Sequence, residues 1–102
     1  MLIAVIEYTL KLGQEERMSE LVNKLLPTLE KTPGFISADP ASSLVQEGIY
    51  YEISYWENDS ALNDWAHNTL HLEAKKEGRQ TILSSYRIVV AEVLRDWSNK
   101  LQ

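Results

Sequence analysis

The segment from Leu2 to Leu12 is apolar on both of its alternating sets of side chains, and this pattern constrains the fold more than any other. One set is Leu2, Ala4, Ile6, Tyr8 and Leu10, and the other begins with Ile3 and Val5. Because successive side chains of a strand point to opposite faces, such a strand needs cover on both sides. A chain of 102 residues has little material for two covering layers. We therefore expect helices on one sheet face and a second copy of the chain on the other.

The rest of the sequence predicts the other elements in turn. Apolar residues at helical spacing from Met18 to Leu29 predict a helix over 14–30, which ends before Pro33 and Gly34. The segments 35–45 and 49–56 read as a hairpin, and Pro40 favours an edge strand or bulge. N-cap side chains occur at Asn58, Asp59 and Ser60 and again at Asn68 and Thr69, and they predict two helices with a break between them. The apolar segment 81–97 is the expected last strand.

This order is βαββαβ, which predicts a ferredoxin-like α+β fold with an antiparallel sheet. We expect residues 1–102 to form a single domain. The formal charge of −5 and the scattered Lys and Arg residues argue against nucleic acid as a partner. The apolar run at the amino terminus is too short to cross a membrane, and it lacks the positively charged region of a signal peptide. The absence of cysteine fits a reducing compartment, so we expect the protein to be cytoplasmic. No nucleotide-binding glycine motif and no set of metal ligands stands out, so we expect no cofactor and no metal.

The most informative stretch runs from Ser54 to His71, SYWENDSALNDWAHNTLH, followed by Gly78-Arg79, Tyr86 and residues 93–97. It resembles the antibiotic biosynthesis monooxygenase family of the dimeric α/β-barrel superfamily. The shared pattern is a strand ending in Trp, a helix opened by acidic and small residues, a Trp nine residues on and a His six residues later. The resemblance implies a homodimer whose two sheets form a barrel, with a pocket between sheet and helices in each subunit. It also implies either cofactor-free oxygenation of quinols or aromatic polyketide-like molecules, or haem degradation.

The haem-degrading branch pairs an Asn on the first strand with a Trp and with a His ten residues beyond that Trp. In this sequence the three positions are occupied by Ile6, Trp65 and Lys75, so only Trp65 matches. Without an imidazole at Lys75 the equivalent axial iron ligand is missing, and haem degradation is disfavoured.

The polyketide-oxygenase branch pairs this Trp with a phenol six residues later, where the present sequence has His71. An imidazole with a pKa near 6.5 suits the removal of a proton from an activated substrate, so we expect His71 to be the base and Trp65 to shape the pocket wall. On an unbroken helix the two side chains would lie about 120° apart. They converge only if the helix breaks at Asn68.

Several aromatic and charged residues have both a structural and a functional interpretation. The expected pocket lining is Trp56, Tyr8, Ile6, Tyr86 and Arg87, although aromatic packing explains the Trp and Tyr residues equally well and Trp97 fits a core or dimer contact. Glu7, Glu52 and Glu92 interrupt apolar strands and have natural partners in Arg87 and Arg95.

His67 and His71 have the four-residue spacing of two zinc ligands on a helix. The Glu of that zinc motif and a third ligand are absent, which favours a capping or solvated role for His67. The charged run 73–79 reads as a solvated helix face.

The sequence therefore predicts a small cofactor-independent monooxygenase that acts as a homodimer on a small aromatic, quinol or polyketide-like molecule. The alternative is a non-catalytic ligand-binding or stress-associated dimer that kept the barrel without the chemistry.

Overall fold

The computed structural model describes residues 1–101 and contains four strands and three helices. The elements are β1 (Leu2–Leu10), α1 (Glu15–Glu30), β2 (Phe35–Ser42), β3 (Tyr50–Trp56), α2 (Asp59–Ala66), α3 (Thr69–Glu77), a π-helical turn η1 (Gly78–Ile82) and β4 (Leu83–Glu92). The strands form one sheet in the order β2-β3-β1-β4, and every neighbouring pair is antiparallel. The predicted ferredoxin-like α+β fold is therefore confirmed. Among residues 1–101, no helix has the length and apolar character needed to cross a membrane.

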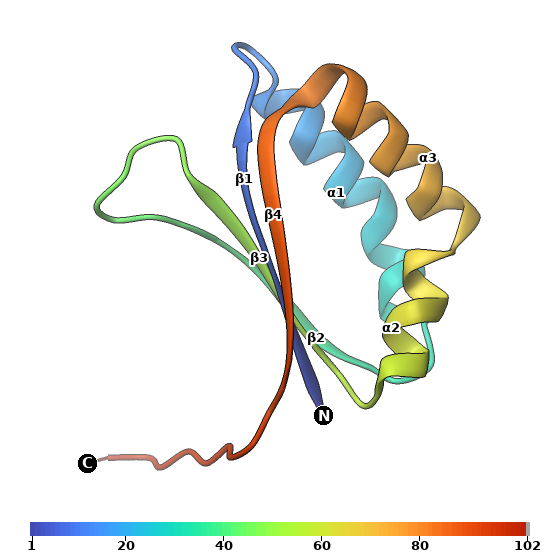
Figure 1. Cartoon of the computed structure of the whole chain (residues 1–102), viewed down its shortest axis with the longest axis vertical. Coiled ribbons are helices and arrows are strands. Elements are labelled where there is room, and N and C mark those ends of the chain that lie inside the picture. Colours follow the sequence, from blue (N-terminus) through green and yellow to red (C-terminus); the bar gives the residue numbers. More distant parts are fainter. Residues whose placement is uncertain (102) are drawn as a thin grey trace.

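The three helices cover one face of the sheet and leave the other face without a helix (Figure 1). The buried centre is formed by Trp56 at the end of β3 with Ala61 and Trp65 of α2. Trp56 is only 1% exposed, its ring meets Phe35 edge-on, and its Nε1 donates to Ser54 Oγ at 2.9 Å. This cluster anchors α2 to the sheet and so fixes the position of Trp65.

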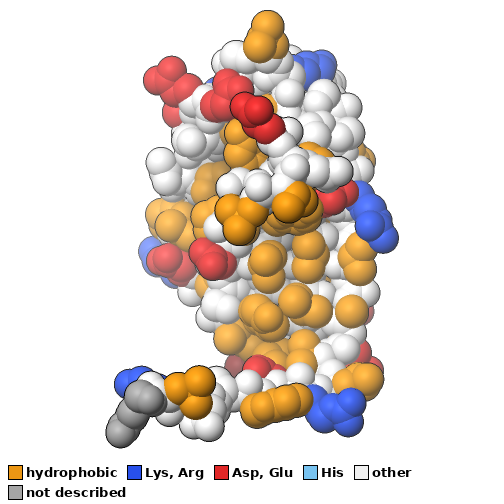
Figure 2. Space-filling model, turned by 90° about the vertical axis from the view of Figure 1, so that its left-hand side faces the viewer, with side chains coloured by type: hydrophobic (Ala, Val, Ile, Leu, Met, Phe, Trp, Pro, Cys, Tyr) orange, Lys and Arg blue, Asp and Glu red, His pale blue; other side chains and the backbone are white. Residues whose placement is uncertain are grey.

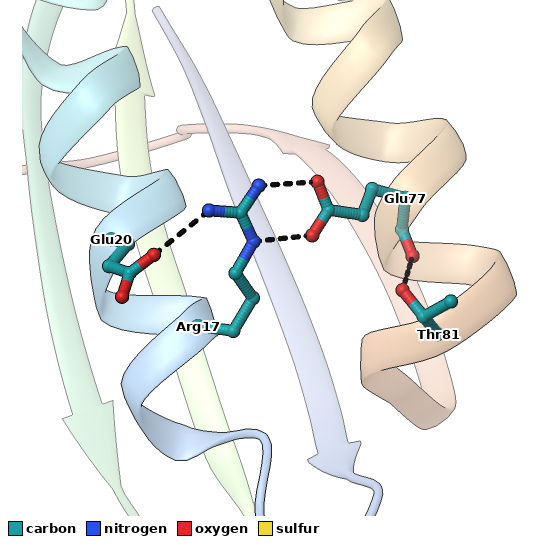
Figure 3. Close-up of polar contacts among 4 residues, drawn as sticks. All are labelled: Arg17, Glu20, Glu77 and Thr81. Carbon is teal, nitrogen blue, oxygen red and sulfur yellow. Dashed lines mark hydrogen bonds and ion pairs between the residues drawn. The ribbon is translucent and has the colours of Figure 1, made fainter.

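A forked ion pair joins α1 to α3 on the outer side of the helical layer (Figure 3). Arg17 donates from Nε and Nη2 to the two carboxylate oxygens of Glu77 at 2.5 and 2.7 Å, and from Nη1 to Glu20 at 2.9 Å. These contacts lower the pKa of Glu77, chiefly through its hydrogen bonds with Arg17. Glu77 remains partly exposed, in agreement with the predicted solvated face over residues 73–79, but it also links α3 to α1, which the sequence did not reveal.

The face of the sheet opposite the helices is apolar, as the space-filling view shows (Figure 2). We call this surface the open face, and its register positions are Ile3 and Val5 of β1, Ile53 and Tyr55 of β3, and Val89 and Ala91 of β4. Val89 is 41% exposed in the single chain. The expected cover on both sides of β1 is therefore present on only one side within one chain.

The chain beyond β4 departs from the sequence prediction. The predicted strand over 81–97 begins at Leu83 and ends at Glu92, and its first residues belong to η1. Residues 93–101 have no regular secondary structure and run away from the helices (Figure 1). Leu94 and Trp97 are 86% and 80% exposed, so Trp97 is not a core residue of the single chain. We call residues 93–101 the C-terminal segment.

Candidate functional site

The break between α2 and α3 lies where the sequence predicts it. Helix α2 ends at Ala66, and Asn68 has extended backbone angles of φ −61° and ψ 131° before α3 begins at Thr69. The side-chain oxygen of Asn68 accepts a hydrogen bond from the backbone N–H of His71 at 3.2 Å, which is N-cap geometry. Asn58 caps α2 in the same way through the N–H of Ala61 at 2.9 Å. The chain therefore changes direction between Trp65 and His71.

This change of direction brings the Trp65 and His71 rings face to face. Their centroids are 4.4 Å apart and their planes differ by 13°. Trp65 is only 8% exposed and belongs to the core cluster with Trp56 and Ala61, whereas His71 is half-buried. The predicted convergence of the two side chains is confirmed, and its cause is the Asn68 cap.

A hydrogen bond fixes which nitrogen of His71 carries the proton. The Nδ1 atom lies 3.0 Å from the backbone carbonyl oxygen of Trp65, and because a carbonyl only accepts, Nδ1–H is the donor. The neutral ring therefore has its lone pair on Nε2. Within residues 1–101 Nε2 makes no hydrogen bond, and no fully buried side-chain nitrogen lacks a partner, so Nε2 remains accessible to solvent.

The surroundings of His71 favour its neutral form. Burial lowers the pKa of His71, the hydrogen bond to Trp65 opposes this effect, and the positive charge of Lys75 lowers the pKa further. Lys75 itself is held by donating from Nζ to the carbonyl oxygen of Ala66 at 2.9 Å, at the end of α2. A neutral imidazole with a solvent-accessible Nε2 lone pair is chemically suited to accept a proton.

His67 has a different environment although it lies only four residues away. It is exposed, and its Nδ1 donates to the carbonyl oxygen of Asn63 at 2.8 Å on the last turn of α2. Its ring has no stacking partner among the described residues. This geometry agrees with the predicted capping role.

The predicted lining residues do not all lie on one side of the sheet. The register pairs Tyr8 with both Tyr50 and Tyr86, and Tyr8 is buried, so these three side chains share the helix-facing side. We call them the tyrosine row. Ile6 lies on the same side. Arg87 follows Tyr86 directly and pairs with Glu7, so it lies on the opposite side, and its predicted place beside Trp65 and His71 is wrong.

The tyrosine row is partly packed and partly accessible. The Tyr8 and Tyr50 rings stack with centroids 5.7 Å apart, and burial raises the pKa of Tyr8, as do the charge of Glu52 and the neighbouring Tyr50. Tyr86 is 47% exposed, and the guanidinium carbon of Arg79 lies 5.9 Å above its ring. Trp56, by contrast, is enclosed in the core at the far end of β3, so it is a packing residue in the single chain.

Two surface hollows lie away from Trp65 and His71. One, of about 450 Å³, lies on the open face between Ile3, Tyr55 and residues 93–97 of the C-terminal segment. The other, of about 100 Å³, lies between α1 and α3 and is bordered by Arg17, Leu70 and Glu77. The first hollow occurs where a second copy of the chain is expected.

Sequence reasoning missed the position of Glu52 and misjudged its partners. Glu52 pairs in register with Ile6 and so lies on the helix-facing side. The ion pairs found among residues 1–101 are formed by Arg17, and Glu52 takes part in none of them. Burial raises the pKa of Glu52, and the charge of Asp39 adds to the effect. The sequence contained the information needed to place Glu52. Glu52 and Trp56 are four residues apart in one strand, so their side chains share a face, and a large aromatic residue such as Trp56 marks the buried face.

The family described as antibiotic biosynthesis monooxygenase matches residues 1–77. The uncharacterised Bacillus subtilis protein YqjZ is 32% identical over 92 residues, which are 90% of this chain and 79% of that protein. A Pyricularia oryzae protein named jasmonate monooxygenase is 29% identical over 73 residues, which are 72% of this chain and 34% of that protein.

Solved structures share the fold at low sequence identity. A Deinococcus radiodurans protein named for the same family has a TM-score of 0.83 at 14% identity, with 100% of both chains covered. The Pseudomonas aeruginosa protein PA3566 has a TM-score of 0.78 at 18% identity and covers 92% of this chain and 94% of its own. At these identities the likeness concerns the fold alone.

Proposed function

The chain belongs to the antibiotic biosynthesis monooxygenase family, and from this premise we propose that it is a cofactor-independent monooxygenase of electron-rich aromatic, quinol or polyketide-like molecules. The observation that carries the proposal is the stacked Trp65–His71 pair, in which Nδ1–H is held by a carbonyl and Nε2 is left to act as a base. The monooxygenase name of the Pyricularia oryzae relative supports the same reaction class.

The proposed reaction begins with a proton transfer. Nε2 of His71 takes a proton from a hydroxyl or an activated carbon of the substrate, and the resulting anion reduces dioxygen with its own electrons. One oxygen atom bonds to the substrate carbon as a hydroperoxide. Cleavage of the O–O bond leaves that atom in the product, and the other atom leaves as water. In this scheme Trp65 provides a flat apolar wall and keeps the His71 ring oriented through its carbonyl and its indole face.

The pH dependence of oxygen consumption tests the proposal. Because burial lowers the pKa of His71, the acid limb of kcat/KM is expected to have its midpoint below 6.5, with full rate above it and loss of rate as the base becomes protonated. An oxygen electrode with hydroquinones and anthrone-like phenols, at pH 4.5 to 8, gives this profile. Saturable binding of these compounds without oxygen uptake would instead support the non-catalytic alternative, and an acid limb at or above 6.5 would argue against His71 as the base.

We also propose that the protein acts as a homodimer through the open face and the C-terminal segment. The support is the size and apolar character of that face, together with the exposure of Leu94 and Trp97 (Figure 2). Because β4 pairs with β1 along its length, the residues beyond the family match are proposed to belong to the same single domain.

Sedimentation of the full chain at micromolar concentration measures the assembly. The expected mass is twice 11.7 kDa, and Val89→Glu, which places a charge on the open face in the middle of β4, is expected to shift the protein to the monomer. Ser19→Glu, which adds the same charge at an exposed position of α1 on the other side of the sheet, serves as the matched control. A wild-type protein that sediments as a monomer would rule out the dimer.

A further inference from the structure

The helix-facing side of the sheet carries an unpaired carboxylate between apolar side chains. In the register, Glu52 of β3 lies opposite Ile6 of β1, and Ile6 lies opposite Ile88 of β4. The tyrosine row is the next row on the same face. Glu52 thus lies on a face made mainly of aromatic and aliphatic groups, with Ser54 in the next row and Glu92 at the far end of β4.

Neither of the predicted arginine partners neutralises this carboxylate. Arg87 lies on the opposite side of the sheet, and Arg95 lies in the C-terminal segment beyond the end of β4. Among residues 1–101 the side chain of Glu52 has no hydrogen bond or ion pair, while no fully buried side-chain oxygen is left without a partner. Its oxygens therefore retain contact with solvent.

Apolar groups of β4, which lie across β1 from Glu52, are also accessible, although they face the helical layer. Tyr86, Ile88 and Val90 of β4 share this side with the buried Tyr8 and Ala4, yet they are 47%, 53% and 48% exposed. The helices thus leave the helix-facing side of β4 uncovered. Half-exposed aromatic and branched side chains that share a sheet face with an unpaired acceptor, with one strand between them, are suited to a flat ring that carries a hydrogen-bond donor.

We propose that Glu52 and the tyrosine row bind the hydroxyl group of the aromatic substrate, with Glu52 accepting the O–H hydrogen bond and Tyr86 and Ile88 contacting the ring. This inference rests on the proposed aromatic substrate and assigns a specificity residue distinct from the base. The raised pKa of Glu52, caused by burial first and by Asp39 second, supports it, because a desolvated carboxylate gains most from a donated hydrogen bond.

Calorimetric titration without turnover tests the inference, with 2-naphthol and 2-methoxynaphthalene as probes under anaerobic conditions. The two probes share the ring and differ in the donor. The wild-type chain is expected to bind 2-naphthol about tenfold more tightly, as for one hydrogen bond to a charged acceptor. Glu52→Gln, which keeps the shape of the side chain, is expected to reduce the preference to about threefold or less. Glu47→Gln, which makes the same change at an exposed carboxylate in the loop between β2 and β3, is expected to keep the full preference.

Equal affinity of the wild type for both probes, no measurable binding of either, or an undiminished preference in Glu52→Gln would each overturn the inference. Circular dichroism establishes that Glu52→Gln is folded, which is expected because the change removes a half-buried charge. The test separates this inference from the proposed activity. A hydroxyl preference that depends on Glu52 in a protein without oxygen uptake would reject the monooxygenase and keep the hydroxyl site.

Discussion

The variant His71→Ala is expected to oxidise an electron-rich aromatic substrate at least about 100-fold more slowly than the wild type, the loss typical of removing a positioned general base. The reason is that Nε2 of His71 is the accessible lone pair beside Trp65, while Nδ1 is committed to the Trp65 carbonyl. Initial rates of oxygen consumption at pH 7.5, where the wild-type imidazole is neutral, measure the effect.

Two further variants separate the base from its neighbours. His71→Phe keeps a flat ring that can stack on Trp65 but has no lone pair, so it is expected to be as inactive as His71→Ala. His67→Ala removes the other imidazole, which is exposed and bonded to the Asn63 carbonyl, and it is expected to keep the wild-type rate. Full activity in His71→Phe would assign the effect of His71 to packing and not to proton transfer.

The variant Trp56→Ala is expected to lower the free energy of unfolding by about 3–5 kcal/mol, the usual cost of truncating a large buried aromatic side chain. Trp56 is 1% exposed, packs edge-on against Phe35 and joins β3 to α2 through Ala61 and Trp65. Since small domains have only about 5–15 kcal/mol of stability, the loss brings the protein close to unfolding. Urea denaturation followed by circular dichroism measures it.

Matched variants test whether Trp56 is a packing residue or a pocket residue. Trp56→Phe retains an aromatic ring and is expected to cost less than half as much as Trp56→Ala, because a smaller cavity remains. Trp97→Ala removes an 80% exposed indole and is expected to change the monomer's stability by less than about 0.5 kcal/mol. A Trp56→Ala protein with wild-type stability but altered substrate affinity would restore the pocket-lining interpretation.

Local chemistry made most of the element order predictable. The helix predicted over 14–30 is observed as α1 at Glu15–Glu30, and the hairpin is observed as β2 and β3 with Pro40 on an edge strand. The break at Asn68 was predictable because Asn next to Thr is a strong cap sequence inside an otherwise helical stretch. That cap, in turn, made the Trp65–His71 contact predictable before any geometry was known.

The errors arise where local pattern and tertiary surroundings disagree. The apolar residues after Glu92 have the pattern of a continued strand, but Leu94 and Trp97 are not buried by any other part of the chain. The pairing of β4 with β1 accordingly ends at Glu92. The π-helical turn at Gly78–Ile82 has no periodicity of its own that a sequence can reveal. The misplacement of Arg87 was avoidable, since Tyr86 and Arg87 are consecutive in a strand and point to opposite faces.

Side-chain partners were less predictable than backbone elements. Opposite charges in sequence gave Arg87 and Arg95 as partners for the strand glutamates, yet Glu7 accepts from the Tyr51 hydroxyl at 3.3 Å. The Arg17–Glu77 fork joins residues sixty positions apart and depends on how α1 and α3 pack. Sequence spacing carries no information on such contacts, which depend on the relative placement of whole elements.

In the proposed reaction the Trp65–His71 pair catalyses oxygenation without a cofactor. Isotope labelling tests it most directly, with chelator-treated and dialysed protein, an anthrone-like substrate and ¹⁸O₂. We expect one labelled oxygen atom per product molecule, a rate unchanged by chelation, and loss of product in His71→Phe but not in His67→Ala. A rate that disappears on chelation, or labelled product formed equally well by His71→Phe, would reject catalysis by this pair.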